Sequence, residues 1–325
     1  MAQHPNGVWI WNLSDIRSDY LDKLVERKVK RVYLKVFDGN YQGQPTFWDW
    51  QCSPEIIQEF ESRDIEVYGW GYHYGTPDIA RQVVKVRQAL NCGLDGYIVD
   101  VEKEVEDKSN HTNVDKLLSA LRIIVNQGTF GYTSFGNPRL HPNVPWQILD
   151  KYCDIALPQI YFEKFTFKPT TPEEVKDCLD AHKKLGLKKP ILPIWSSESD
   201  TAKPASAAEL QDYLNYYPGS SIWRIPNEGE RGEAWNLIYS GFQLPTLKRN
   251  LRQGRTGEDV KAVQKVMNAR GYNAGTVDAN FGSQTQAAVR AFQKEAGLAV
   301  DGEVGKLTWI ALGGKCQLPL PTLRD

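Results

Sequence analysis

Short apolar stretches alternate with longer amphipathic stretches along the first 240 residues of the chain. The apolar stretches are rich in β-branched and aromatic residues, which favour strands, whereas the amphipathic ones repeat their apolar positions at helical spacing. This pattern predicts strands at 8–13, 31–37, 66–74, 94–104, 129–135, 155–162, 191–196 and 221–225. It predicts helices at 15–27, 54–63, 77–90, 114–125, 146–151, 172–185, 207–216 and 232–238.

Eight strand–helix units in succession predict an α/β fold, a (β/α)8 TIM barrel, over residues 1–241. The short, Pro-containing segment 242–248 is interpreted as a linker, and 249–325 as a second domain. Helical patterns at 259–270, 283–296 and 304–312 predict a small three-helix domain there. It contains an internal repeat, because 275–285 and 298–308 each place an Asp, then a Gly, then a Thr at the opening of a helix.

The fourth predicted strand ends in two carboxylates, Asp100 and Glu102. Alternation along a strand places both side chains on one face, and active sites of (β/α)8 barrels lie at the C-terminal ends of the strands. Two close carboxylates repel each other, which raises the pKa of one of them and creates the acid that glycoside cleavage needs. We therefore expect Glu102 to be the general acid and Asp100 to stay ionised beside it. The alternative is that the pair only meets solvent or caps the next helix.

Polar and aromatic residues also end the other predicted strands, and we expect them to contact substrate. Tyr161 is expected to be a third catalytic residue, beside Asp100 and Glu102, that hydrogen-bonds an amide group of the substrate. The remaining substrate-binding candidates are Lys35, Asp38, Tyr72, His73, Tyr74, Gln159, Glu163, Trp195 and Trp223. Alternatives stay open: Lys35 pairs with a barrel carboxylate, His73 is a hydrogen-bonded core residue, and the tryptophans are packing residues.

Composition narrows the possible partners. The formal net charge of −1 does not favour binding to nucleic acid or to an anionic membrane surface. No apolar stretch is long enough to span a bilayer, and the N-terminus does not resemble a signal peptide. The five cysteines have no metal-like spacing and are interpreted as reduced thiols, so no metal or other cofactor is expected. We expect a monomer.

The C-terminal motifs resemble the peptidoglycan-binding domain of many cell-wall hydrolases. The resemblance covers nearly all of 249–313 and is carried by motifs that include Gly257-Glu-Asp-Val260, Val277-Asp278, Phe281-Gly282, Phe292-Gln293, Val300-Asp-Gly302 and Thr308-Trp309. It departs from the family at Ala279, where Gly is common. The resemblance implies peptidoglycan as partner and a targeting module without chemistry of its own.

The barrel resembles glycoside hydrolase family 25 lysozymes more loosely. The similar motifs are Lys35-Val-Phe-Asp38-Gly39, Tyr72-His73-Tyr74, Asp100-Val-Glu102 and Gln159-Ile-Tyr161. That family has acids on strands one and eight, where this chain has Trp9 or Asn12 and Trp223-Arg224. The fourth strand equally resembles family 18 chitinase-like enzymes, with Ile98 in place of one of their acids.

These resemblances imply a muramidase-like peptidoglycan hydrolase of the endolysin or autolysin type, retaining or substrate-assisted, that acts at the bacterial cell wall. Two alternatives remain open. One is a catalytically degenerate barrel that binds the wall, which the missing acids favour. The other is an amidase or peptidase, which the lack of a metal or Cys-His signature disfavours.

Overall fold

The computed structural model describes residues 5–27, 29–160, 172–196, 217, 219–228, 245–269 and 272–312. The chain divides into two compact units, one with the alternating strands and helices and one with residues 240–325. We describe each unit by itself. The predicted helices at 207–216 and 232–238 lie outside the described residues.

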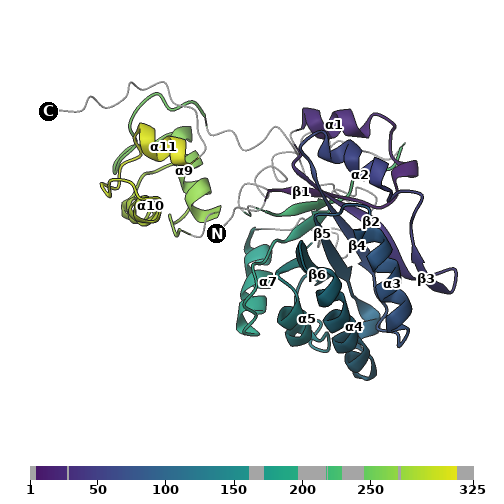
Figure 1. Ribbon diagram of the computed structural model, residues 1–325. Helices are drawn as coiled ribbons and strands as arrows, with labels where there is room; N and C mark the ends of the chain where they lie inside the picture. The colour runs from purple at the N-terminus through teal and green to yellow at the C-terminus, as the bar shows by residue number, and fades with distance from the viewer. Residues whose placement is uncertain are drawn as a thin grey trace. The chain divides into compact units, whose positions relative to one another are not determined.

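Eight parallel strands form a closed barrel in the first unit, which confirms the predicted fold class (Figure 1). Each strand pairs with the next along the ring, and the last pairs with the first. Most are shorter than predicted, because pairing ends where the rim loops begin. In ring order they are β1 (Gly7–Ile10), β2 (Arg31–Tyr41), β4 (Glu66–Tyr72), β5 (Gly96–Asp100), β6 (Thr129–Phe135), β7 (Ile155–Gln159), β8 (Ile194–Ser196) and β9 (Ser221–Trp223).

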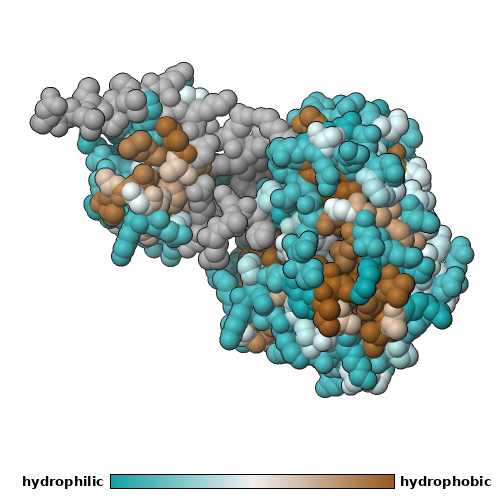
Figure 2. All heavy atoms as spheres, in the orientation of Figure 1, coloured by the Kyte–Doolittle hydropathy of each residue, from teal (hydrophilic) through white to brown (hydrophobic). Residues whose placement is uncertain are grey.

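Helices cover the outside of the sheet (Figure 1). They are α1 (Tyr20–Glu26), α2 (Pro54–Glu61), α3 (Ile79–Leu90), α4 (His111–Ile124), α5 (Trp146–Tyr152) and α7 (Pro172–Lys184), with short 3-10 turns at Leu13–Asp15, Lys103–Glu106 and Lys108–Asn110. Figure 2 shows hydrophobic side chains over the region of α3 and α4, where Val84 and Ile123 are exposed. Within the described ranges, no helix has the length and apolar character needed to cross a membrane.

The barrel carries one strand that the sequence pattern did not predict. β3 (Gln44–Phe47) pairs antiparallel with the C-terminal part of β2. Gln42 and Gly43 connect the two strands, and both have positive φ angles of 51° and 88°. Two such residues in succession are typical of the tight turns whose twist matches a β-hairpin. The β2–β3 hairpin therefore extends from the C-terminal end of β2, beside the mouth of the barrel (Figure 1).

The second unit contains the three predicted helices, α9 (Glu258–Ala269), α10 (Ser283–Glu295) and α11 (Lys306–Ala311). Their apolar faces enclose a small core that includes Met267, Phe281, Val289 and Trp309.

The internal repeat of this unit is organised around two buried glutamines. The side-chain amide nitrogen of Gln264 lies 2.9 Å from Asp278 Oδ1 and 3.2 Å from Thr285 Oγ1, and its oxygen accepts a bond from the Ala279 N–H. A side chain that satisfies so many buried polar groups fixes the turn against the helix.

The second copy repeats this arrangement. Gln293 donates to Asp301 Oδ1 at 2.7 Å and to Thr308 Oγ1 at 3.1 Å, and accepts from the Gly302 N–H at 2.8 Å. The residue after each Asp has a positive φ, 63° at Ala279 and 71° at Gly302. The repeat that the sequence shows is thus also a structural repeat, and the departure at Ala279 falls on a position that favours glycine.

Candidate active site

Four side chains form one row across the C-terminal mouth of the barrel. Asp38 on β2 is in register with Tyr72 on β4, Tyr72 with Asp100 on β5, and Asp100 with Thr133 on β6. Registered residues of parallel strands point to the same face, and neighbouring strands lie about 4.8 Å apart. Asp100 therefore lies inside the mouth, between an aromatic ring and a hydroxyl group.

Glu102 lies two residues after Asp100, the last residue of β5, and is half-buried. The amide nitrogen of Gln159, the last residue of β7, lies 2.8 Å from Glu102 Oε1 and 3.3 Å from Asp100 Oδ1. One amide therefore holds both carboxyl groups, so three of the predicted site residues come together as a unit.

The surroundings of Asp100 oppose the ionised state that we expected from the sequence. Burial raises its pKa well above the usual range, and the neighbouring charge of Glu102 raises it further. Lys35 opposes both effects. The alternative, that a strand-end carboxylate meets solvent, does not describe Asp100, which is only 6% exposed. Burial thus opposes ionisation of Asp100, and Glu102 is the more accessible partner.

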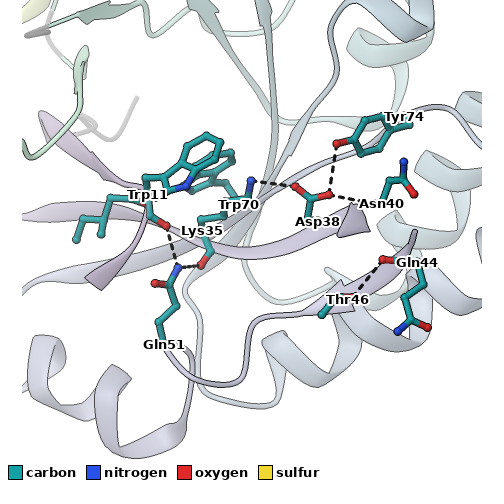
Figure 3. A network of polar contacts seen from close by, with 10 residues as sticks. Trp11, Lys35, Asp38, Asn40, Gln44, Thr46, Gln51, Trp70 and Tyr74 are labelled. Atoms are coloured by element: carbon teal, nitrogen blue, oxygen red, sulfur yellow. Dashed lines mark hydrogen bonds and ion pairs between the residues drawn. The ribbon is translucent and has the colours of Figure 1, made fainter. Parts of the chain in front are cut away.

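Lys35 lies below the mouth and forms an ion pair with Asp38, with 3.0 Å between Nζ and Oδ2 (Figure 3). Its Nζ also lies 3.9 Å, 4.7 Å and 5.1 Å from the ring centroids of Trp11, Trp48 and Trp70. Burial lowers the pKa of Lys35, whereas Asp38 acts to raise it. Lys35 is 1% exposed and pairs with a barrel carboxylate, which is the alternative that the sequence left open beside substrate binding.

An irregularity in β2 makes this pair possible. Three residues apart in a regular strand, Lys35 and Asp38 would point to opposite faces. The register with β4 shifts between Lys35 and Phe37, so one extra residue is accommodated in β2. Both charged side chains consequently face the barrel interior.

Two tyrosines complete the mouth near Asp38. The Tyr72 hydroxyl donates to Glu104 at 2.7 Å, and the Tyr74 hydroxyl lies 3.4 Å from Asp38 Oδ1. Partial burial is the main cause that raises the pKa of Tyr74 to about 12. Both rings are half-buried, so they are placed to line a groove. Glu104 was not among the predicted site residues, although it ends the predicted strand 94–104, and the bond from Tyr72 brings it to the mouth.

His73, predicted as a substrate-binding residue, lies in the core, as the alternative of a hydrogen-bonded core residue describes. The side chain is completely buried. Its Nδ1 lies 2.8 Å from Gln82 Oε1 and its Nε2 lies 3.0 Å from the Tyr97 hydroxyl. Strand alternation turns His73 toward the helices, away from the face that carries Tyr72. Burial lowers its pKa to about 4, so it is neutral at physiological pH.

The two tryptophans predicted as substrate platforms also differ from expectation. Trp195 is 4% exposed and belongs to the core. Trp223 is half-buried, and its ring packs against Trp9, Trp11 and Trp70 with centroids 5.5–6.1 Å apart. Packing thus accounts for Trp195, whereas Trp223 keeps a partly open position. Tyr161 and Glu163 lie outside the described residues.

The positions that carry acids in family 25 enzymes hold other groups here. Trp9 on β1 is buried, and its Nε1 donates to Ser221 Oγ at 2.8 Å. Asn12 caps the 3-10 turn after β1. Arg224, after β9, donates to Asn227 Oδ1 at 2.8 Å. Across the described parts of the chain, no group of three or more His, Cys, Asp or Glu side chains is placed to hold a metal ion.

Comparison with known proteins identifies the second unit. Residues 256–312 match the family model described as "Putative peptidoglycan binding domain". The chain is 37% identical over 87 residues to N-acetylmuramoyl-L-alanine amidase CwlL of Bacillus licheniformis, and 36% identical over 77 residues to a spore cortex-lytic enzyme of Bacillus cereus. Each match covers 22% of this chain, and 24% and 30% of the relatives. The chain thus spans less than a third of either relative.

Solved structures share the fold of the barrel. A chitinase from Rhizomucor miehei superimposes with a TM-score of 0.54 and 13% identity, and covers 73% of this chain and 99% of its own. The spore cortex-lytic enzyme SleL of Bacillus megaterium gives a TM-score of 0.52 at 10% identity, and covers 76% of each chain. The chain therefore joins a TIM barrel, with the fold of these glycan-cleaving and cortex-lytic proteins, to a C-terminal domain that matches the peptidoglycan-binding family.

Proposed function

We propose that this chain is a peptidoglycan hydrolase that cleaves glycosidic bonds of the glycan strand, as a muramidase does. The observation that carries the proposal is the pair of Asp100 and Glu102 at the C-terminal end of β5, both within reach of the Gln159 amide. The match of 256–312 to peptidoglycan-binding domains supports the choice of substrate. The lytic functions in the relatives' names support hydrolysis of the cell wall, while the choice of the glycosidic bond rests on the carboxyl pair.

In the proposed reaction Glu102 gives its proton to the glycosidic oxygen as the bond breaks. Burial raises the pKa of Asp100, and the charge of Glu102 raises it further, so the two groups titrate together and can share a proton. One oxygen of each carboxyl group lies within 3.3 Å of the same amide nitrogen, so the two oxygens are closer together than the carboxyl groups that flank the water in inverting enzymes. This spacing supports retention of configuration.

The sugars of the wall carry acetamido groups, which can act as the nucleophile in a substrate-assisted reaction. The acetamido oxygen attacks the anomeric carbon while the leaving oxygen takes the proton of Glu102. Water then attacks the same carbon, the bond from that carbon to the acetamido oxygen breaks, and the proton lost by the water returns to Glu102. We assign Asp100, and Tyr161 as a further proposal, to the orientation of that acetamido group.

The test is digestion of purified peptidoglycan, with mass spectrometry of the products. Glu102→Gln keeps the shape and a hydrogen-bonding group but removes the transferable proton, so we expect turnover to fall by about 10²–10⁴-fold. Glu61→Gln makes the same chemical change at an exposed position of α2 and should leave turnover unchanged. New reducing ends would identify the bond. If Glu102→Gln digests peptidoglycan at the wild-type rate, either another residue is the general acid or the barrel is not a glycosidase.

A barrel that binds the wall without cleaving it is the second candidate. The observation in its favour is that Trp9 and Trp223, instead of acids, occupy β1 and β9. If wild type and Glu102→Gln are equally inert on every wall preparation, this second candidate replaces the first. Release of free stem peptides would instead indicate an amidase.

A further inference from the structure

Exposed aromatic rings are confined to one corner of the barrel. Among the residues that the structure describes, the exposed aromatic side chains are Trp11, Tyr41 and Trp50, at 42%, 38% and 48% exposure. Trp11 follows β1, and the other two lie at the tip of β2 and just after β3. Elsewhere on the described barrel the exposed large hydrophobic side chains are aliphatic, such as Val84 and Ile123 on the outer helices. The exposed aromatic side chains therefore distinguish this corner of the rim from the rest of the described barrel surface.

The rings at the hairpin are held in place by one another. Trp50 stacks on Trp48 with centroids 4.9 Å apart and 28° between the planes, and Trp48 is only 5% exposed. Tyr41 packs against both rings at 5.6 Å and 5.8 Å. The Trp48 backbone N–H is bonded to the Val36 carbonyl at 2.9 Å, which ties the stack to the barrel. One face of Trp50 is therefore covered while the side chain stays exposed in a fixed position.

The groups around these rings suit a sugar. Exposed polar side chains on the same hairpin and loop are Asn40, Gln42, Gln44 and Asp49. Flat aromatic faces stack on the C–H faces of pyranose rings, while amide and carboxylate groups bond the hydroxyls. In the described hairpin, 31–47, no exposed Leu, Ile or Val lies beside these rings. This composition favours a glycan over an apolar protein partner.

The corner is continuous with the candidate active site. The ammonium of Lys35 contacts both the Trp11 and the Trp48 rings. Thr46 on β3 is in register with Asp38, which belongs to the row that leads to Asp100. Three strand spacings separate β3 from β5, or about 14 Å. A glycan of a few units spans that distance.

We propose that Trp11, Tyr41 and Trp50 form a glycan-binding platform that holds sugar units several positions away from the bond to be cleaved. This proposal rests on the proposed function for the identity of the glycan. It implies that the barrel prefers long glycan strands, because a disaccharide bound at Asp100 and Glu102 is too short to reach Trp50 beside the hairpin.

The test uses the full chain carrying Glu102→Gln, so that bound glycan is not consumed. Calorimetric titration measures binding of peptidoglycan glycan strands freed of stem peptides, in a long fraction and as disaccharide. We expect Trp50→Ala to weaken binding of long strands by about 3- to 10-fold and to leave the disaccharide unaffected. Trp50→Tyr keeps a ring and should retain most of the affinity. Val84→Ala on α3 is the control for loss of an exposed hydrophobic side chain.

Three results would overturn the platform. They are equal binding of long strands by Trp50→Ala and Val84→Ala, an equal loss for disaccharide and long strands, or no binding of long strands by the parent chain. Because the measurement is binding and not turnover, its outcome is separate from that of the digestion experiment. If the chain binds long strands through Trp50 but cleaves nothing, the platform proposal stands and the hydrolase proposal is rejected.

Discussion

Removing the charge of Lys35 is the perturbation that best separates its structural role from a role in binding substrate. Lys35→Met keeps a long, flexible side chain among the tryptophans and deletes the ammonium group. Side-chain exposure in the pair is 2% for Lys35 and 12% for Asp38. Breaking a buried ion pair by removing one partner costs about 3–5 kcal/mol. Asp38 keeps donors from the Asn40 N–H and the Tyr74 hydroxyl. We therefore expect a loss near the lower end of that range, about 3 kcal/mol.

The double variant Lys35→Met/Asp38→Asn tests whether the loss comes from the unpaired charge. The introduced amide would keep an acceptor for the Asn40 N–H but would leave no buried charge. We expect the double variant to lose less stability than the two single variants added together, with a coupling of about 1–3 kcal/mol. In Asp38→Asn alone, Lys35 keeps its charge without a counter-ion.

Urea unfolding followed by tryptophan fluorescence is the assay. Nine of the ten tryptophans lie within residues 1–241, so fluorescence reports chiefly on the barrel in the full chain. The pH dependence of the unfolding free energy is an independent test of the same ion pair. Burial lowers the folded-state pKa of Lys35 below its usual 10.5, so the unfolded chain binds more protons between those two values, and stability rises with pH there. Strictly additive losses, or an Asp38→Asn variant whose stability does not rise toward alkaline pH, would refute the buried-pair reasoning.

Three further predictions concern single positions. Asp100→Asn should impair turnover yet stabilise the fold at pH 7, because the raised pKa of Asp100 makes the stability of the wild type fall as pH rises above 3.8. Thermal melts from pH 3 to 8 should therefore show the melting temperatures of the two proteins converging in acid. A lower melting temperature for the variant at pH 7 would contradict this. Ala279→Gly should stabilise the C-terminal unit by about 0.5–1 kcal/mol, as relief of a left-handed conformation outweighs the added chain entropy. Gly302→Ala should destabilise it, because its Cβ would meet Arg290 and Gln286 side-chain atoms at 2.8 Å, and calorimetry of the full chain would show both changes.

The barrel was predictable because its signal is periodic and repeated. Each strand is apolar enough to be recognised without its neighbours, and the predicted strand at 129–135 coincides with β6. The carboxyl pair was predictable for a related reason, since two acids after an apolar strand are conspicuous. The two acids, Gln159 and Tyr72 all lie at or just after strand ends. The topology of the barrel alone brings these strand ends together at one mouth.

The differences between the sequence predictions and the structure have local causes. His73 was grouped with Tyr72 and Tyr74 because all three end a strand, although alternation already places its side chain on the opposite face. The pairing of Lys35 with Asp38 depends on a register shift that no composition signal marks. The β2–β3 hairpin had a weak signal in the Gln42-Gly43 dipeptide, but the flanking residues do not alternate clearly enough to predict strands.

The ionisation of Asp100 shows how burial can reverse an assignment that charge spacing suggests. From two acids on one face, sequence reasoning can conclude that one pKa is raised, but it cannot say which, because mutual repulsion is symmetric. Burial breaks the symmetry: Asp100 lies inside the mouth, whereas Glu102 follows the strand and is half-buried. A protonated inner carboxyl below a more accessible outer one is an arrangement in which a proton can be held near Glu102 while substrate approaches from the solvent side. The charge of Lys35 limits how far the pKa of Asp100 rises, so the ion pair with Asp38 also affects the proton at the site. If the site works this way, Lys35→Met should change the pH profile of turnover even where the protein remains folded.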